Sequence, residues 1–285
     1  MSNAISLTSS LSRNLSSLQA TQELMDATEY KLTTGKKVNS ALDDPISFFT
    51  SENHLDRAND LSTLKDSMSE SIETINAADE GITAIQDLIS DGKALLQSAL
   101  SADNETDMND YITQYNEILS QIDDMAEDSG YGDINLLGGT TQTLEVVFDE
   151  DGESKITLTG FDASTTGLSL TDAASASFYT GTEAGGDFTV TKTGVNALID
   201  ELDAAKTTLR TKSKTLSTQL SIVEARNDFT SNMITLLEAG SADLVNADTT
   251  TEGVNLTTLQ TQQSLAVNSL TIANSASQAV LNLFS

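Results

Sequence analysis

The residues of this chain that could do chemistry are mostly carboxylates. Acidic pairs occur at Asp43–Asp44, Asp123–Asp124 and Asp149–Asp151, and glycoside hydrolysis and calcium binding both rely on carboxylates held close together. The chain contains 43 acidic residues, and solvent-exposed helix faces and turns are commonly acidic. Acidic neighbours are therefore expected without any catalytic or metal-binding role. We therefore interpret these pairs as solvated surface, and we predict no catalytic residue and no metal site among them.

Other reactive side chains are scarce. The chain has one histidine, His54, and no cysteine, which excludes Cys–His catalysis and the helix motif of two-histidine metalloproteases. The run GYGDINLLGG (residues 130–139) lacks the lysine and the spacing of a phosphate-binding loop. We predict that the protein is not an enzyme and that it has no cofactor.

The charge of the chain limits its partners. The formal net charge is -29, which repels phosphate backbones and anionic lipid headgroups, so we expect no nucleic acid and no membrane partner. The start, MSNAISLTSSLSRNLSSLQ, has neither a basic segment nor a continuous apolar run. We therefore expect no cleavable signal peptide.

Apolar residues recur at three- and four-residue spacing along most of the chain, which predicts long helices. Thr34-Gly35 is a typical helix end, Ser40 and Asp43 fit a capping box at the next helix start, and Gly81 and Gly92 are sites where that helix could bend. Between Gly130 and Gly194 the helical period disappears. There, TLEVVF and KITLTGF predict a β-hairpin with an acidic, glycine-containing turn at residues 149–152.

These patterns predict a mainly α fold with a small β-hairpin region, in which the N- and C-terminal halves form a long antiparallel helical coiled-coil bundle. We divide the chain into six segments. They are an N-terminal assembly helix (1–34), a connector (35–56), the N-terminal part of a helical core (57–130), a short β-rich variable outer segment (131–194), the C-terminal part of the core (195–247) and a C-terminal assembly helix (248–285).

The two ends of the chain are almost free of charge. Residues 1–22 contain only Arg13, and residues 254–285 contain no charged residue at all. An unpaired ion is costly to bury, and a polymer repeats that cost in every copy, so neutral ends suit helices that sister molecules surround. A head-to-tail contact that does not close then makes an open filament. We predict a subunit interface along the heptad seams of both ends, formed by Leu11, Leu15, Leu18, Met25, Leu32, Leu256, Leu259, Ala266, Leu270, Ala273, Val280 and Phe284.

Three runs of the sequence resemble bacterial flagellin. They are TGKKVNSALDDP (residues 34–45), GYGDINLLGG (residues 130–139) and NADTTTEGVNLTTLQTQQSLAVNSLTIANSASQAVLNLF (residues 246–284). The resemblance covers nearly all of residues 1–160 and 195–285. Because residues 161–194 are few, the chain is similar to a near-minimal flagellin.

The resemblance implies a subunit of the extracellular flagellar filament that serves motility, exported unfolded through the flagellar type III apparatus. It implies a homopolymer, with an export chaperone and cap and junction proteins as further partners. It also implies that the connector includes Gly35, Asn39, Ser40, Asp43, Asp44 and Pro45. Exposure and the resemblance together suggest O-glycosylation at Ser164, Thr165, Thr166, Ser175, Ser177 and Thr180.

Two other functions fit the sequence. A flagellar hook-filament junction protein shares such ends but stacks only a few copies, so it forms no long filaments alone. A secreted coiled-coil adhesin or translocator binds a host surface. The neutrality of both ends favours packing between identical chains.

Overall fold

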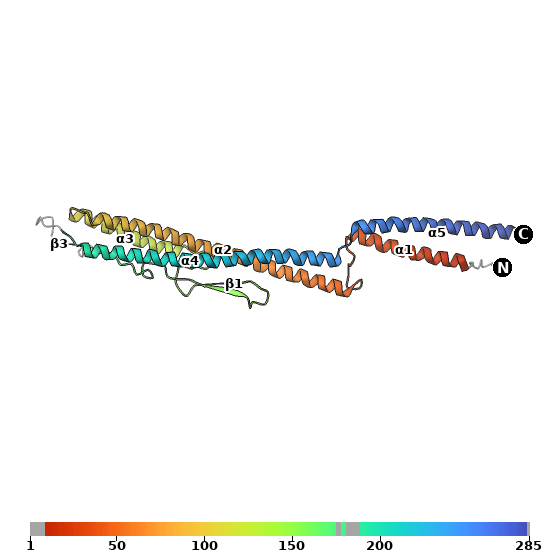
Figure 1. Ribbon diagram of the computed structural model, residues 1–285, viewed down its shortest axis with the longest axis horizontal. Coiled ribbons are helices and arrows are strands. Elements are labelled where there is room, and N and C mark those ends of the chain that lie inside the picture. Colours follow the sequence, from red (N-terminus) through yellow and green to blue (C-terminus); the bar gives the residue numbers. More distant parts are fainter. Residues whose placement is uncertain (1–8, 175–177, 181–188, 284–285) are drawn as a thin grey trace. The chain divides into compact units, whose positions relative to one another are not determined.

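The structure is a computed structural model that describes residues 9–174, 178–180 and 189–283 (Figure 1). This part of the chain is mainly helical, and its β structure consists of two short antiparallel strand pairs, which confirms the predicted fold class. The helices are α1 (Ser9–Thr34), α2 (Pro45–Ala99), α3 (Glu105–Asp128), α4 (Lys192–Val245) and α5 (Thr249–Leu283). The strands are β1 (Thr143–Val147), β2 (Lys155–Thr159), β3 (Tyr179–Thr180) and β4 (Thr189–Val190).

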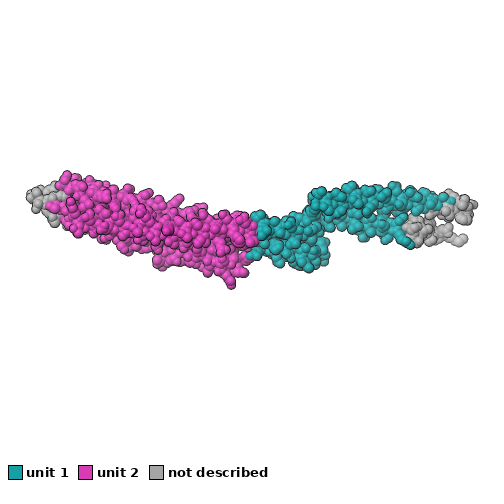
Figure 2. Space-filling view, in the orientation of Figure 1, with its two compact units in different colours: residues 1–58, 235–285 teal, residues 59–234 magenta. Residues whose placement is uncertain are grey.

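The chain divides into two compact units, coloured separately in Figure 2. Unit 1 contains the residues up to Ala58 and those from Thr235 onward, and unit 2 contains Asn59–Ile234. The boundaries fall inside α2 and α4, so both long helices contribute to both units.

In unit 2, α2 and α4 run antiparallel, with α3 completing a three-helix core. Cross-helix contacts fix this register: Lys93 forms an ion pair with Asp203 at 2.6 Å, Ser213 donates to Asp79, and Lys65 donates to Ser231. The core side chains repeat at heptad spacing. They include Met68, Ile75, Ile82, Ile89, Leu96, Met108, Ile112, Tyr115, Leu119, Ile122, Leu202, Leu209, Leu216 and Val223.

The two glycines of α2 have different surroundings, and neither interrupts the helix. A Cβ atom added at Gly81 would lie 2.6 Å from the Cβ of Ser129 and 2.8 Å from Cδ1 of Leu137. A Cβ atom added at Gly92 would meet its nearest neighbours, on Ile118 and Tyr115, at 3.6 Å. Gly81 therefore allows the end of α3 to approach α2 closely, whereas Gly92 leaves room for a methyl group.

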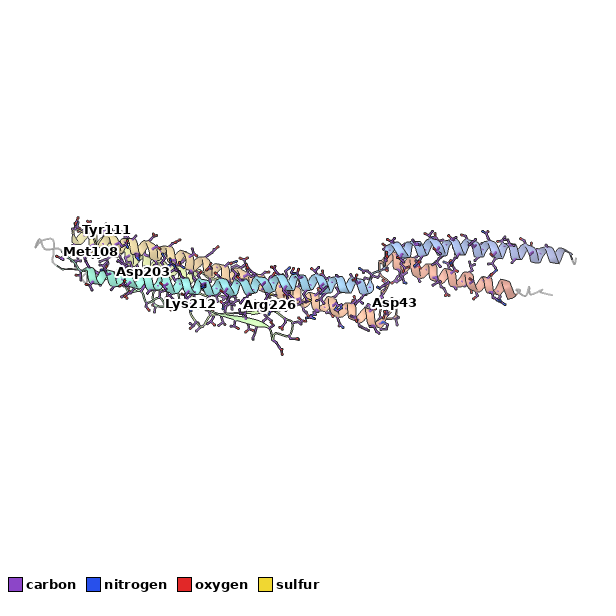
Figure 3. All side chains as sticks on the ribbon, in the orientation of Figure 1. Asp43, Met108, Tyr111, Asp203, Lys212 and Arg226 are labelled. Carbon is purple, nitrogen blue, oxygen red and sulfur yellow. The ribbon has the colours of Figure 1, made fainter. Side chains whose placement is uncertain are left out.

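The predicted hairpin is confirmed. Strands β1 and β2 pair antiparallel from Thr143 opposite Thr159 to Val147 opposite Lys155, and Gly152 in the turn has a φ of 72°. Two aromatic rings that follow the strands lie against basic residues of α4, Lys212 and Arg226, which are labelled in Figure 3. Arg226 lies over the ring of Phe148 at 5.2 Å, and Lys212 lies over Phe161 at 5.1 Å.

The segment after the hairpin is held to the helices by polar side chains. Asn116 of α3 accepts from the backbone N–H of Ala173 and donates to its carbonyl, both at 2.9 Å. Asp123 accepts from the backbone N–H and the hydroxyl of Thr165. Farther along, β3 pairs with β4, and the hydroxyl of Tyr179 donates to Glu105 at 2.6 Å. The sequence did not predict this second strand pair.

Candidate assembly interface

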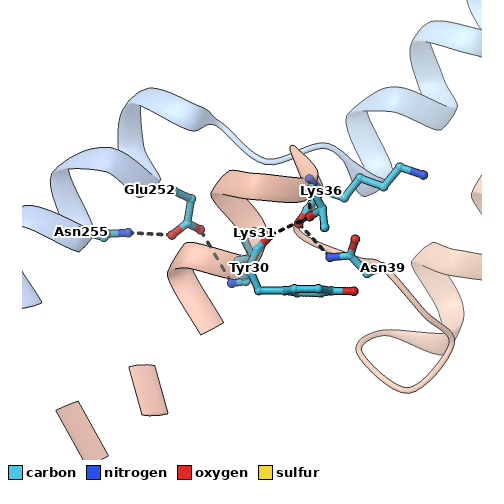
Figure 4. A network of polar contacts seen from close by, with 7 residues as sticks. Tyr30, Lys31, Lys36, Asn39, Glu252 and Asn255 are labelled. Atoms are coloured by element: carbon cyan, nitrogen blue, oxygen red, sulfur yellow. Dashed lines mark hydrogen bonds and ion pairs between the residues drawn. The ribbon is translucent and has the colours of Figure 1, made fainter. Parts of the chain in front are cut away.

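The two terminal helices, α1 and α5, pair with each other inside unit 1 (Figure 1). Gln263 donates to Gln22 at 2.6 Å, and Lys31 lies 3.7 Å from Glu252, so the two helices run antiparallel. Figure 4 shows the second contact, together with the bond from Asn255 to Glu252. The helices therefore meet through neutral amides at the middle of their contact and through one ion pair near the connector.

The predicted seam residues lie mainly on the faces that α1 and α5 turn toward each other. Met25 is buried, and Leu15 is exposed. The half-buried members are Leu18, Leu32, Leu256, Leu259, Ala266, Leu270 and Ala273. Leu11 and Val280 belong to the helices, although their side chains are not among those described, and Phe284 lies outside the described residues. The role of these residues between subunits stays a prediction.

A second apolar set, which sequence reasoning missed, faces outward from the same helices. In α5, Leu265 is 61% exposed and Ile272 is 71% exposed, and Val254 is also exposed. These three residues are eleven and seven positions apart, so they share one face of the helix. In α1, Leu24 and Tyr30 are exposed as well. The sequence does contain this second apolar repeat, but the repeat of the seam residues is longer and more regular.

Several hydroxyls of α5 have a hydrogen-bond partner within the helix. Those of Thr258, Thr261, Ser264 and Thr271 each donate to the carbonyl four residues earlier, at 2.9 to 3.0 Å. A hydroxyl that already has a partner loses less on burial than one that depends on water. A neighbour that covers these four hydroxyls therefore displaces little hydrogen bonding to water.

The segment between α1 and α2 is anchored to the end of α4. Gly35, which ends α1 as predicted, has a φ of 70° and accepts at its carbonyl from the N–H of Ala247. The N–H of Lys37 donates to the carbonyl of Val245 at 2.7 Å, and Val38 is buried. Asn39 donates to the carbonyl of Lys36 (Figure 4). Backbone contacts thus fix this segment on α4.

Two aspartates shape the start of α2. Asp43 accepts from the N–H groups of Asn39 and Ser40, which lowers the pKa of its carboxyl. Asp44 accepts from the hydroxyl and N–H of Ser47 and from the N–H of Ile46, which lowers its pKa too. Each carboxylate stays ionised because hydrogen bonds favour the charged form.

The expected capping box of Ser40 and Asp43 is therefore wrong. Asp44 occupies the capping position, and Pro45 is the first residue of α2, where its missing N–H is not needed. The helix thus starts inside the segment 35–56 that we assigned to the connector, and residues 45–56 are helical. The Ser40–Asp43 contact forms a turn that leads to the cap.

The other candidate groups of the sequence have structural neighbours. His54 of α2 lies near Gly240, and next to it the hydroxyls of Ser51 and Ser241 are hydrogen-bonded at 2.8 Å. Within the described residues, no cluster of acidic or histidine side chains is arranged to hold a metal ion. In the same residues, no helix has the length and apolar character needed to cross a membrane.

The residues suggested for O-glycosylation differ in their surroundings. Thr166 is exposed. The hydroxyls of Ser164 and Thr165 donate to Asp162 and Asp123. Ser175, Ser177 and the side chain of Thr180 lie outside the described part of the chain. Modification at these positions stays a prediction.

Comparisons with known proteins agree across nearly the whole chain. Residues 5–142 match the family model of the bacterial flagellin N-terminal helical region, and residues 199–284 match that of the C-terminal helical region. The chain is 30% identical to flagellin FljM of Caulobacter vibrioides, over 99% of this chain and 98% of that protein. It is 29% identical to a flagellin of Brucella melitensis, over 95% of each chain. Among solved structures, the crystal structure of Bacillus cereus flagellin is similar with a TM-score of 0.45 and 18% identity, covering 57% of this chain and 88% of that one.

Proposed function

The chain belongs to the bacterial flagellin family, and on that premise we propose that the outward faces of α1 and α5 are the surfaces through which its copies assemble. The protein is a structural subunit that polymerises with itself into the extracellular flagellar filament used for motility. The observation that carries the proposal is the pair of exposed apolar residues Leu265 and Ile272 on a helix face without charge.

The physical reason is the small amount of surface that two helices can bury against each other. A Leu or Ile side chain gains about 1.5 to 3 kcal/mol when it is fully removed from water, and α1 cannot supply that to the far side of α5. Sister chains can cover this side, and four hydroxyls of α5 already have partners within the helix when they do. The buried and half-buried seam residues of α1 and α5 hold the two helices together.

The sharpest test places a charge on the outward face of α5. We expect Ile272→Lys to abolish filament formation while the helical content of the monomer is unchanged, because an unpaired ion buried between copies costs several kcal/mol. Ile272→Val, the matched control, keeps the position apolar and should assemble. Sedimentation and electron microscopy measure assembly, and filaments of normal length from the lysine variant would refute the proposal.

A truncation tests the same helix as a whole. Removal of residues 256–285 should leave unit 2 folded, since its core contains no residue of α5. We expect this chain to remain monomeric where the full chain forms filaments. Micrometre filaments from the full chain alone would also separate it from a hook-filament junction protein.

We further propose that the chain is exported through the flagellar type III apparatus without a cleavable signal peptide, and that an export chaperone and cap and junction proteins are its partners. The exposed apolar face of α5 supports a chaperone, because such a surface invites premature association before export. Mass spectrometry of filaments shed from cells tests this. If the first residue of the filament protein were an internal residue of the sequence, a leader would have been removed. That result would contradict export without a cleavable signal peptide.

The proposed subunit catalyses no reaction and carries no metal or cofactor, in keeping with a structural family. O-glycosylation at the exposed Thr166 is compatible with this role. An intact mass of filament protein equal to that of the bare chain would exclude it.

A further inference from the structure

The helix α5 contains a single charged residue, and that residue lies against α1. Glu252 is in the first turn of α5, four positions before Leu256, so it continues the seam of this helix by one step. Its side chain is 17% exposed. The carboxylates of α1, on Glu23, Asp26 and Glu29, belong by contrast to exposed residues. Glu252 is therefore the carboxylate that the pairing of the two helices takes partly out of water.

Two groups share the oxygen atoms of this carboxylate (Figure 4). The Nζ atom of Lys31 lies 3.7 Å from Oε1, and the side-chain amide of Asn255 donates to Oε2 at 3.5 Å. Of these two partners, Lys31 carries the charge, and its side chain is 38% exposed. Tyr30, the residue next to it, is exposed as well. In a single chain the ion pair thus still meets water through the lysine.

Coverage by sister chains changes the surroundings of this ion pair. Under the proposed function, neighbours bury the outward faces of α1 and α5, so Lys31 beside the exposed Tyr30 loses its access to water. A carboxylate without a cation would then be an unpaired buried ion, which is strongly destabilising. Two neutral side chains in the same place are often as stable as the buried ion pair. What the filament requires at Glu252 is therefore balance of charge, and attraction between the partners is secondary.

We propose that Lys31 serves assembly by neutralising Glu252, so that the one charge of α5 enters the filament as part of a balanced pair. The inference rests on the proposed function, because it concerns a charge that neighbouring copies enclose. In the free chain the partners keep their contact with water, where ion pairs contribute little to stability. Lys31 therefore matters for polymerisation, and the fold of the single chain does not depend on it.

Neutralising one partner and then both separates charge balance from attraction. We expect Lys31→Met, which leaves Glu252 unpaired, to raise the protein concentration at which filaments begin to form by about tenfold or more. The double variant Lys31→Met/Glu252→Gln has no charge at this place and should assemble at nearly the concentration of the unaltered chain. The matched control is Lys36→Met, which should not change this concentration. Lys36 is exposed just after α1 and forms no ion pair with any residue that the structure describes.

Sedimentation measures this concentration, and circular dichroism of the free chain measures helical content, which should be the same in all variants. Lys31→Arg keeps the cation and should assemble like the unaltered chain. Normal assembly of Lys31→Met, a double variant as impaired as the single one, or loss of helical content in free Lys31→Met would each overturn the role of Lys31. The proposed function would still stand, because Ile272→Lys tests it separately. If the unaltered chain formed no filaments, the proposed function itself would fail.

Discussion

Replacement of Gly81 by alanine is expected to destabilise unit 2, although alanine is the better helix former. The new methyl carbon would lie 2.6 Å from Cβ of Ser129 and 2.8 Å from Cδ1 of Leu137, whereas carbon atoms in contact normally stay about 3.5 to 4.0 Å apart. Leu137 is fully buried and cannot turn aside. The hydroxyl of Ser129 donates to the carbonyl of Met125 at 2.5 Å and would have to move as well.

The magnitude follows from three contributions. Alanine in place of glycine inside a helix gains about 1 kcal/mol. Forcing an extra methyl group into a packed site costs about 1 to 3 kcal/mol, and loss of the Ser129 hydrogen bond costs about 1 kcal/mol more. The free energy of unfolding should therefore fall by about 1 to 3 kcal/mol.

Gly92 provides the control on the same helix. Its added methyl group would meet Ile118 and Tyr115 at an ordinary distance of 3.6 Å, so only the gain in helix propensity remains. Gly92→Ala should raise the free energy of unfolding by about 1 kcal/mol. The two glycine variants therefore differ in the sign of their effect.

Urea denaturation of the monomer, followed by circular dichroism, measures both variants. Adding Ser129→Gly to Gly81→Ala should recover part of the loss, because it removes both atoms of the nearest obstacle, and the two sites should couple. If Gly81→Ala were as stabilising as Gly92→Ala, the close approach of α3 to α2 would be wrong.

Three further results are expected. Asn116→Ala should release the backbone of Ala173, at a cost of about 1 to 3 kcal/mol, and faster hydrogen exchange at the Ala173 amide would show it. The carboxyl of Asp248, which accepts hydrogen bonds from the hydroxyl and N–H of Thr251, has a pKa below its ordinary value of 3.8. The stability that the ionised carboxylate gives to the start of α5 is thus fully present above pH 3.8 and is lost as the pH falls through the lowered pKa. A carboxyl NMR titration measures this pKa. Asp248→Asn should remove the pH dependence. Sulfate, which is excluded from protein surface, should lower the concentration at which filaments form, and a sedimentation assay in which sulfate had no effect would contradict burial of the apolar face.

Periodicity in the sequence was enough to predict most of the fold. A three- and four-residue apolar repeat is a local property, so the helices and the end of α1 at Gly35 could be placed without a structure. The β1–β2 hairpin was equally visible, because alternating residues surround an acidic turn. The β3–β4 pair was not, since strands of two residues show no period.

Contacts between distant residues account for what the sequence could not predict. The seam and the outward stripe of α5 have similar spacing, and only the position of α1 decides which one is covered within the chain. The sequence predicts the cap of α2 at Ser40 and Asp43 because both residue types suit a cap, but the neighbouring Asp44 also suits it and directly precedes Pro45. The sequence alone predicts a weak point of α2 at Gly81, whereas the neighbouring Ser129 shows that a side chain has no room there.

The short β3–β4 ladder makes the chain leave and re-enter the helical scaffold at one place. Thr180 lies opposite Thr189, and the N–H of Thr191 donates to the carbonyl of Phe178 at 2.6 Å. Because β3 and β4 are already held together by hydrogen bonds, a longer insert between them would not change the length of α4 or the contacts of the neighbouring helices. The connection between β3 and β4 could thus be lengthened, or carry a foreign epitope, without a change to the helices.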